Sequence, residues 1–218
     1  EIDDYKKHFA KDKAVAKNWT VGSPCGATLQ ELIENVDITV LIGTSGQPGT
    51  FTKGVVKQMC KNSNKPVIFP LSNPPANCEA LPEDIYKWSN GKAVVATGSP
   101  FANVEFKGKS YRVGQGNNVF IFPGVGLAAI VGKVPFISND MFTTSAYALA
   151  DCVTANDLAE NAVYPHIGDL QCVSIKVAEA CLAGVAAHYP KLGIKVEDVP
   201  SLIEENIWKP EYFPYKKV

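Results

Sequence analysis

Three short apolar runs recur along the first half of the chain, and each is followed by small residues. They are I-T-V-L-I-G (residues 38–43), K-P-V-I-F-P-L (65–71) and A-V-V-A-T-G (93–98). A run of this length and composition is typical of a β-strand that is buried on both faces. Helical patterns beginning at Thr52 and Leu81 separate the runs. Strands that alternate with helices predict an α/β doubly wound parallel sheet of Rossmann type with right-handed crossovers.

The helices beside these strands carry start signals. Thr28 precedes an apolar-periodic run and Glu31 follows three residues later, the pattern of a capping box. Pro82 occupies the first turn of the helix over residues 81–88. The side chains expected to face the core from the first two helices are Leu29, Leu32, Ile33, Val36, Val55, Val56 and Met59.

After the third strand the pattern changes twice. Residues 103–113 alternate apolar and polar side chains around Lys107-Gly108, which favours a β-hairpin decorating the surface. Beyond it the chain is helical, with a run over 125–133 that is apolar nearly all round and so predicts a buried helix.

We expect further helices over 138–153, 171–188 and 201–208, and a helix near residues 6–18 at the other end. The sequence thus predicts a partial Rossmann-type domain over residues 1–134. A helical extension and an aromatic docking tail follow over 135–218.

Composition restricts the function. The 218 residues are 46% hydrophobic and 20% charged with a net charge of -1, and the basic residues are scattered, which argues against a nucleic-acid partner or an anionic membrane surface. No apolar run reaches the roughly 20 residues of a membrane helix, and the charged start is unlike a signal peptide. Because the first residue is Glu1 rather than methionine, we expect a piece of a longer protein.

The six cysteines occur singly. This favours buried thiols in a reducing compartment, and therefore an intracellular protein of the cytoplasm or an organelle matrix such as the mitochondrion or hydrogenosome.

Small polar loops follow all three predicted strands: residues 43–46, 72–74 and 98–100. In an open parallel sheet, ligands bind in the crevice beyond the carboxyl ends of the strands. Backbone N–H groups and small side chains there suit a nucleotide, although loops favour such residues in any protein.

The adjacent amides Asn117 and Asn118 follow a Gly-Gln-Gly sequence that we expect to form a turn. Glycines with positive φ would let the backbone approach a ligand, and the amides would supply two donors and two acceptors at one point. An ordinary turn that tolerates asparagine explains the same residues.

No metal-ligand cluster, Ser-His-Asp set or G-x-G-x-x-G after a strand is present. The residues therefore predict binding groups and no catalytic acid, base or metal ligand.

Four blocks in order are similar to the carboxyl-terminal part of the malic enzyme family. They are L-I-G-T-S-G-Q-P-G-T-F-T, F-P-L-S-N-P, A-T-G-S-P-F and G-Q-G-N-N-V-F-I-F-P-G-V-G, and the resemblance covers nearly the whole chain. It implies oxidative decarboxylation of L-malate to pyruvate and CO₂, with NAD or NADP and Mg²⁺ or Mn²⁺, in a homo-oligomer (dimer or tetramer).

The resemblance also assigns binding residues. It implies that Asn73 and Asn117 bind substrate, and the predicted cofactor-binding residues are Gly43, Ser45, Ser72, Asn73 and Asn118. The acid, base, metal ligands and dinucleotide glycine motif of that family lie upstream of the matching region, so no catalytic or metal-binding role is carried onto this chain. Alternatives are a malolactic enzyme, which yields lactate, and a non-catalytic nucleotide-binding module; Gly116 favours the malic enzymes over the malolactic ones.

Overall fold

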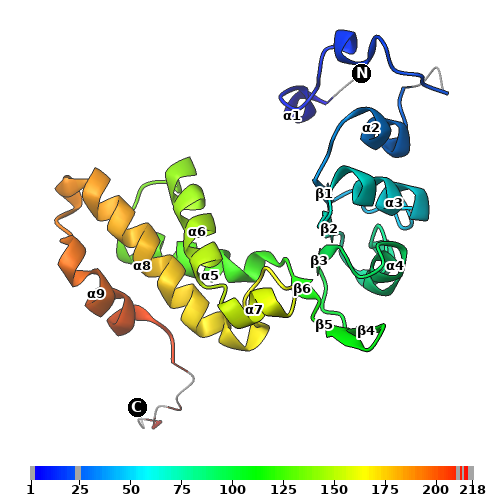
Figure 1. The fold of residues 1–218 in the computed structure, drawn as a ribbon. Helices are drawn as coiled ribbons and strands as arrows, with labels where there is room; N and C mark the ends of the chain where they lie inside the picture. The colour runs from blue at the N-terminus through cyan, green and yellow to red at the C-terminus, as the bar shows by residue number, and fades with distance from the viewer. Residues whose placement is uncertain (1–2, 23–25, 210–211, 213, 216–218) are drawn as a thin grey trace.

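The computed structural model describes residues 3–22, 26–209, 212 and 214–215. Its first half contains a four-stranded parallel sheet in the order β1-β2-β3-β6. The strands are β1 (Val40–Gly43), β2 (Val67–Pro70), β3 (Val94–Thr97) and β6 (Gly114–Gln115), and a helical segment continues beyond β6 (Figure 1). The predicted α/β class, with a parallel sheet followed by helices, is confirmed.

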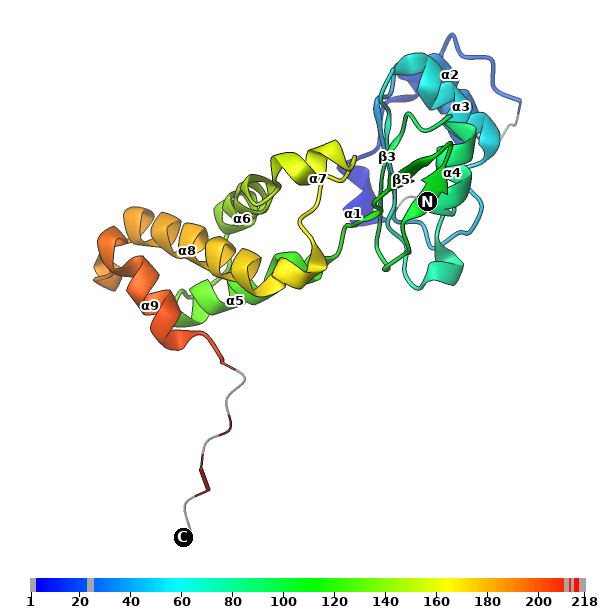
Figure 2. The ribbon, with the colours of Figure 1, turned by 60° about the horizontal axis from the view of Figure 1, so that its bottom comes forward.

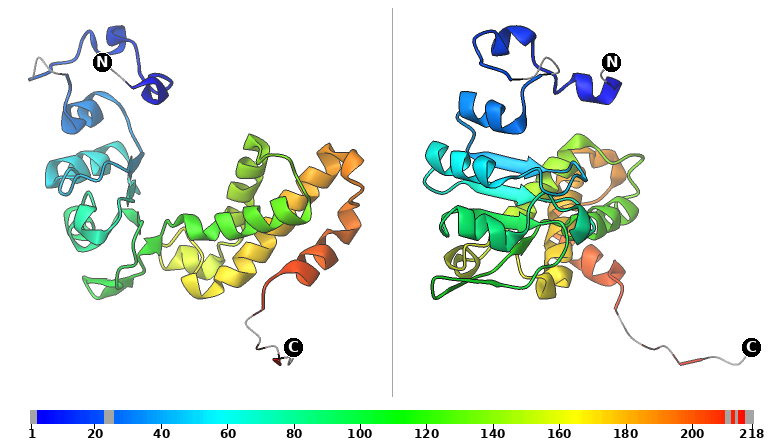
Figure 3. Two further views of the ribbon diagram at one scale, coloured as in Figure 1. Left: turned by 180° about the vertical axis from the view of Figure 1, so that it is seen from behind. Right: turned by 90° about the vertical axis from the view of Figure 1, so that its right-hand side faces the viewer.

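Helix α2 (Leu29–Asn35) precedes β1, whereas α3 (Lys53–Asn62) connects β1 to β2 and α4 (Pro82–Trp88) connects β2 to β3. The capping box of Thr28 and Glu31 is present, so the predicted start of α2 is confirmed. Both α3 and α4 lie on the side of the sheet that faces away from the helical segment (Figures 1 and 3). Only one face of the sheet is therefore covered by these crossover helices.

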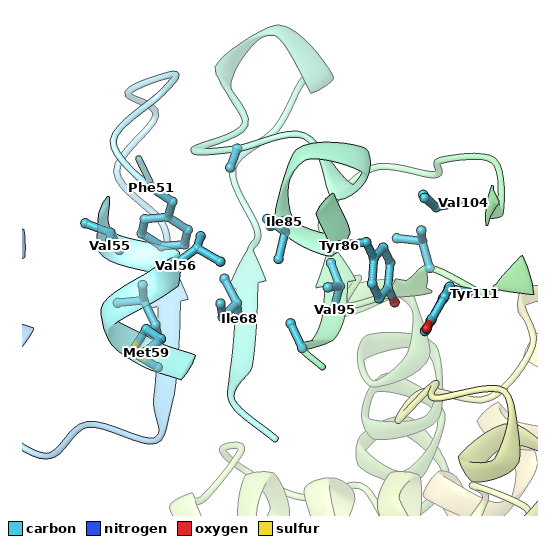
Figure 4. Packing of buried hydrophobic residues seen from close by; sticks show 14 of the residues in the cluster. Phe51, Val55, Val56, Met59, Ile68, Ile85, Tyr86, Val95, Val104 and Tyr111 are labelled. Atoms are coloured by element: carbon cyan, nitrogen blue, oxygen red, sulfur yellow. The ribbon is translucent and has the colours of Figure 1, made fainter. Parts of the chain in front are cut away.

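The core of the α/β part lies between the strands and these helices (Figure 4). Leu41, Ile68 and Val95 point into it from the three long strands. The opposite face of β1 is open, since Val40 is 50% and Ile42 56% exposed. The prediction that this strand is buried on both faces is therefore wrong for β1. The helix residues of the core include Ile33, Val55, Val56, Met59, Ile85 and Tyr86.

The predicted hairpin forms from β4 (Val104–Phe106) and β5 (Lys109–Tyr111), which pair antiparallel. Lys107 and Gly108 at its turn both have positive φ. The hairpin is more than surface decoration, because the buried ring of Tyr111 packs against Tyr86 of α4 with ring centroids 4.5 Å apart.

The Gly-Gln-Gly sequence is not a turn. Gly114 and Gln115 form β6, which extends the sheet beside β3, and neither Gly114 nor Gly116 has positive φ. A Cβ at Gly116 would lie 2.9 Å from Leu71 Cδ2 and 3.2 Å from the Tyr164 hydroxyl oxygen. These glycines allow close packing against neighbouring chain segments, which explains their presence without left-handed backbone geometry.

The helical segment contains α5 (Phe122–Val131), α6 (Asn139–Asp151), α7 (Ala155–Ala159), α8 (Leu170–His188) and α9 (Val199–Asn206). Figure 2 shows these helices grouped together, apart from the labelled strands β3 and β5. Contrary to the expectation from the sequence, the segment around α8, residues 167–188, is long and apolar enough to cross a membrane by length and composition. Its buried residues pack with those of α5, α6 and α9 in a second hydrophobic core, as expected of a core helix.

The prediction that α5 is buried all round is wrong. Gly124, Val125 and Ala128 are buried against α8, whereas Phe122 is 53% and Ile130 77% exposed. The helix has an apolar face toward its own core and a second one toward solvent.

The chain ends differ from expectation. The predicted helix over residues 6–18 is replaced by two short turns, α1 (Asp4–Lys7) and the 3-10 turn η1 (Lys13–Ala16). In the tail, Trp208 is 78% exposed and Tyr212 is fully exposed, so neither folds back onto this chain. Residues 210, 211 and 213 lie outside the described residues, and the proposed domain boundary at residue 134 stays a prediction.

Among the described cysteines, Cys78 and Cys181 are buried, Cys60 and Cys152 are half-buried and Cys172 is exposed, so the expected burial applies to only part of the thiols. Cys25 lies outside the described residues.

Candidate functional site

Four loops lie in a row where the parallel strands β1, β2, β3 and β6 end. In open parallel sheets this carboxyl edge is where ligands bind. Every predicted binding residue falls here: Gly43 ends β1, and the others follow the ends of β1, β2 and β6. A surface hollow borders the end of β1, lined by Leu29, Leu41, Ile42, Gly43, Thr44, Ser45, Thr50 and Phe51.

Glu79 joins the first two loops. Its carboxylate is fully buried, and Oε1 accepts hydrogen bonds from the Ser45 N–H (2.8 Å), the Ser45 hydroxyl (2.8 Å) and the Ser72 hydroxyl (2.5 Å). Oε2 accepts a longer bond from the Ser72 N–H at 3.4 Å. Ser45 and Ser72, which were predicted to bind cofactor, are therefore held together by one side chain that the sequence interpretation missed.

The carboxylate also sets the orientation of both hydroxyl groups. A carboxylate only accepts hydrogen bonds, so Ser45 and Ser72 must direct their protons toward Glu79. Their oxygens in turn accept the next N–H groups of the loop, from Gln47 to Ser45 (3.2 Å) and from Gly46 to Ser72 (2.9 Å). The result is a continuous hydrogen-bonded network across two strands.

The network stabilises the charged form of Glu79. Burial acts to raise the pKa of this carboxyl group, but the hydrogen bonds from the Ser72 hydroxyl and from the N–H and hydroxyl of Ser45 outweigh it. The pKa is therefore held below its ordinary value. Glu79 is ionised at neutral pH.

Asn73 and Ser99 join the second and third loops. The Ser99 hydroxyl donates to Asn73 Oδ1, and the Thr97 hydroxyl donates to the Ser99 carbonyl oxygen at 2.8 Å. Gly98, the first residue of the third loop, lies close to the second, because a Cβ there would be 2.1 Å from the Leu71 carbonyl oxygen and 3.0 Å from Asn73 Nδ2. The absence of a side chain at Gly98 permits this approach.

Asn117 joins the third and fourth loops. Its Nδ2 donates to the Gly98 carbonyl oxygen at 3.4 Å, and its Oδ1 accepts from the Val119 N–H at 2.9 Å, capping a 3-10 turn, η3 (Asn118–Phe120). Asn73 and Asn117, the two predicted substrate-binding residues, thus lie on either side of Gly98. Asn118 is exposed at the start of this turn.

The described residues hold no group of three or more His, Cys, Asp or Glu side chains that could bind a metal ion. The histidines at positions 8, 166 and 188 are exposed. The groups available to a ligand at the carboxyl edge are therefore side-chain amides, hydroxyls and backbone groups.

Glu79 carried a weak signal in the sequence. It is the single charged residue in the stretch C-E-A-L (78–81), which connects the second strand to its helix. Apolar neighbours on both sides indicate that this acidic residue is buried. A buried carboxylate in turn needs hydrogen-bond or charged partners. The residues that supply those partners, 34 and 7 positions earlier, are not identifiable from the sequence.

Comparison with known proteins decides the family. Residues 1–186 match the family model described as malic enzyme, NAD binding domain. The chain belongs to the malic enzyme family. It is 38% identical over 214 residues to the NAD-dependent malic enzyme of Sodalis glossinidius, and 40% identical over 219 and 215 residues to those of Aeromonas salmonicida and Acinetobacter baylyi.

These alignments cover 98%, 98% and 99% of this chain and 38% of each of the three relatives. The chain therefore spans about two fifths of a typical malic enzyme of this group. The resemblance inferred from the four sequence blocks is confirmed.

Proposed function

We propose that the natural polypeptide carrying this sequence is an NAD-dependent malic enzyme that converts L-malate and NAD to pyruvate, CO₂ and NADH. The observation that carries the proposal is the joined row of loops at the carboxyl edge of the sheet, in a chain of this family. The names of the relatives favour NAD over NADP and malic over malolactic enzyme. They also favour an enzyme over a non-catalytic module.

The fit of a dinucleotide rests on open space at the edge. A Cβ added at Gly46 or Gly49 in the loop after β1 would meet nothing within 4 Å. When bound, NAD would accept a hydride from the carbon that carries the hydroxyl of malate. Ser45 and Ser72 would border it from the first two loops, Gly43 from the end of β1, and Asn118 from the far end of the row.

Asn73 and Asn117 are proposed to hold the substrate. The Oδ1 of Asn73 accepts from Ser99, and its Nδ2 has no hydrogen-bond partner among the described residues. An amide N–H in this position can donate to a carboxylate oxygen of malate. Both ends of the Asn117 amide are hydrogen-bonded, which fixes its position relative to Gly98 and would hold the proposed substrate-binding groups in one geometry.

We assign no catalytic acid or base, and no Mg²⁺ or Mn²⁺ ligand, to the described residues. The proposed metal and the proton-transfer groups would come from residues other than these. Residues 1–218 alone are accordingly expected to show no malate-dependent NAD reduction, because no acid–base group is placed at the edge. Robust turnover by that chain would contradict this assignment.

The activity is tested on the full natural polypeptide with L-malate, NAD and Mn²⁺, and D-malate serves as the control. The proposal predicts equal amounts of NADH and pyruvate. Lactate without net NADH would favour the malolactic alternative, and the absence of any malate consumption would refute an enzyme acting on malate.

A homo-oligomer, either a dimer or a tetramer, is also proposed. Trp208, Tyr212 and Tyr215 expose aromatic surface, and such residues are enriched at subunit contacts. Removing residues 207–218 should lower the mass measured by light scattering. An unchanged mass would rule out the tail as the contact.

A further inference from the structure

Glu79 is a buried ionisable group that the proposed reaction does not use. Its side chain is fully buried, and no ion pair to it is found within the described residues. Burying an unpaired carboxylate is costly unless hydrogen bonds replace its hydration. The bonds from Ser45 and Ser72 fill this role, and both serines belong to loops predicted to contact the dinucleotide.

The loop after β1 is tied to Glu79 at both of its ends. Ser45 bonds to the carboxylate near the start, and the Phe51 N–H donates to the Glu79 carbonyl oxygen at 3.1 Å near the finish. Gly43 makes room for the carboxylate, because a Cβ there would be 2.6 Å from Glu79 Cδ and 2.7 Å from Phe51 Cζ. The close packing of Glu79 and Phe51 thus explains the glycine at the end of β1.

The same network removes N–H groups from the ligand side of this loop. The successive N–H groups of Ser45, Gly46 and Gln47 are bonded to Glu79, Ser72 and Ser45. Phosphate-binding loops present successive free N–H groups to the anion. This loop presents none of these three, so it does not offer the set of free N–H donors that a phosphate needs.

We propose that Glu79 is a positioning residue for the dinucleotide: its carboxylate fixes the loops after β1 and β2 in one relative position and orients the Ser45 and Ser72 hydroxyls. This inference rests on the proposed function. Glu79 touches neither substrate nor cofactor and acts through the two serines. Its ionised state, maintained by the lowered pKa, gives the network a charge-assisted acceptor.

The test uses the full natural polypeptide with Glu79→Gln and Glu79→Ala. Glutamine keeps the shape and one acceptor oxygen but loses the charge, whereas alanine leaves the donors of both loops without a partner. We expect the KM for NAD to rise by about threefold to tenfold in Glu79→Gln and by more than about tenfold in Glu79→Ala, with kcat falling by less. Glu83→Gln is the matched control, since Glu83 is exposed in the first turn of α4 and loses the same charge.

Two outcomes would contradict the inference. A KM for NAD within about twofold of wild type in both folded variants would overturn the inference, as would a loss of kcat with no change in KM. If Glu79→Ala fails to fold, Glu79→Gln decides in the same way, because it leaves the carboxylate site filled.

Titration calorimetry with NAD alone tests the positioning role of Glu79 separately from the proposed reaction. A wild type that binds NAD but does not turn over malate would refute the proposed function, while the dissociation constants of the variants would still test Glu79. A wild type that turns over malate with unaffected Glu79 variants would refute only the positioning role.

Discussion

Gly98→Ala is expected to damage the candidate site more than any other single methyl group added along the carboxyl edge. The new Cβ would lie 2.1 Å from the Leu71 carbonyl oxygen and 2.9 Å from its carbonyl carbon. Real Cβ atoms keep at least 3.0 Å, so the two strands must separate by about 0.9 Å at this point. The obstacle is backbone, which cannot rotate away as a flexible side chain would.

The displacement acts on stability and on function. Overpacking of this kind costs about 1 to 3 kcal/mol, and a backbone obstacle places Gly98→Ala at the upper end of that range. Asn73 and Asn117 both contact the Gly98 region, so their amides move with it. A misplacement of about 1 Å can lower catalysis about 100-fold, which we expect for kcat/KM with malate.

Urea unfolding and steady-state kinetics of the full natural polypeptide check both numbers. Gly184→Ala is the control, because a Cβ at this position inside α8 meets nothing within 4 Å. It should leave activity unchanged and raise stability by up to about 1 kcal/mol through helix propensity. If Gly98→Ala matched wild type in urea midpoint and in kcat/KM, the close approach of the β2 and β3 loops would be refuted.

Three further perturbations have defined outcomes. Asn117→Ala should lower kcat/KM for malate by about 1 to 3 kcal/mol of transition-state binding with the fold retained, and unchanged kinetics would contradict its role. Because the pKa of Glu79 is lowered in the folded state, its stabilisation is present above the ordinary pKa of 4.5 and lost as pH falls through the folded value. Wild type should therefore lose more unfolding free energy on acidification than Glu79→Gln, and equal acid profiles would count against this. Within α5, Gly124→Ala should lower the urea midpoint of the 218-residue chain, since its Cβ would be 2.7 Å from the Ser174 carbonyl oxygen, while Gly126→Ala, facing open space, should raise it.

Local patterns predicted the parts of the fold that local chemistry determines. The capping box at Thr28 and the proline in the first turn of α4 mark the starts of their helices because the stabilising groups lie within one turn. The three long strands were predictable because apolar β-branched runs have few other places to be buried. The hairpin turn at Lys107-Gly108 follows from the positive φ that glycine accommodates.

The errors share a physical cause. The two residues of β6 have no strand signature of their own, and they become a strand because β3 offers them a free edge. We overestimated the burial of α5 and β1. An apolar side chain favours burial, but it does not show whether another segment packs against it. The local sequence holds no information on these partners.

The candidate site is an extreme case of the same dependence. Each loop of the carboxyl edge is ordinary in sequence, and long-range side-chain hydrogen bonds join it to its neighbour: those of Glu79 and Ser72 between the first pair, of Asn73 between the second and of Asn117 between the third. Since these bonds arise only once the strands are in register, the ligand-binding geometry is produced by the sheet rather than by any one motif. A substitution in one loop should therefore alter the geometry of the next loop. For paired substitutions in adjacent loops, we expect the changes in free energy to be non-additive.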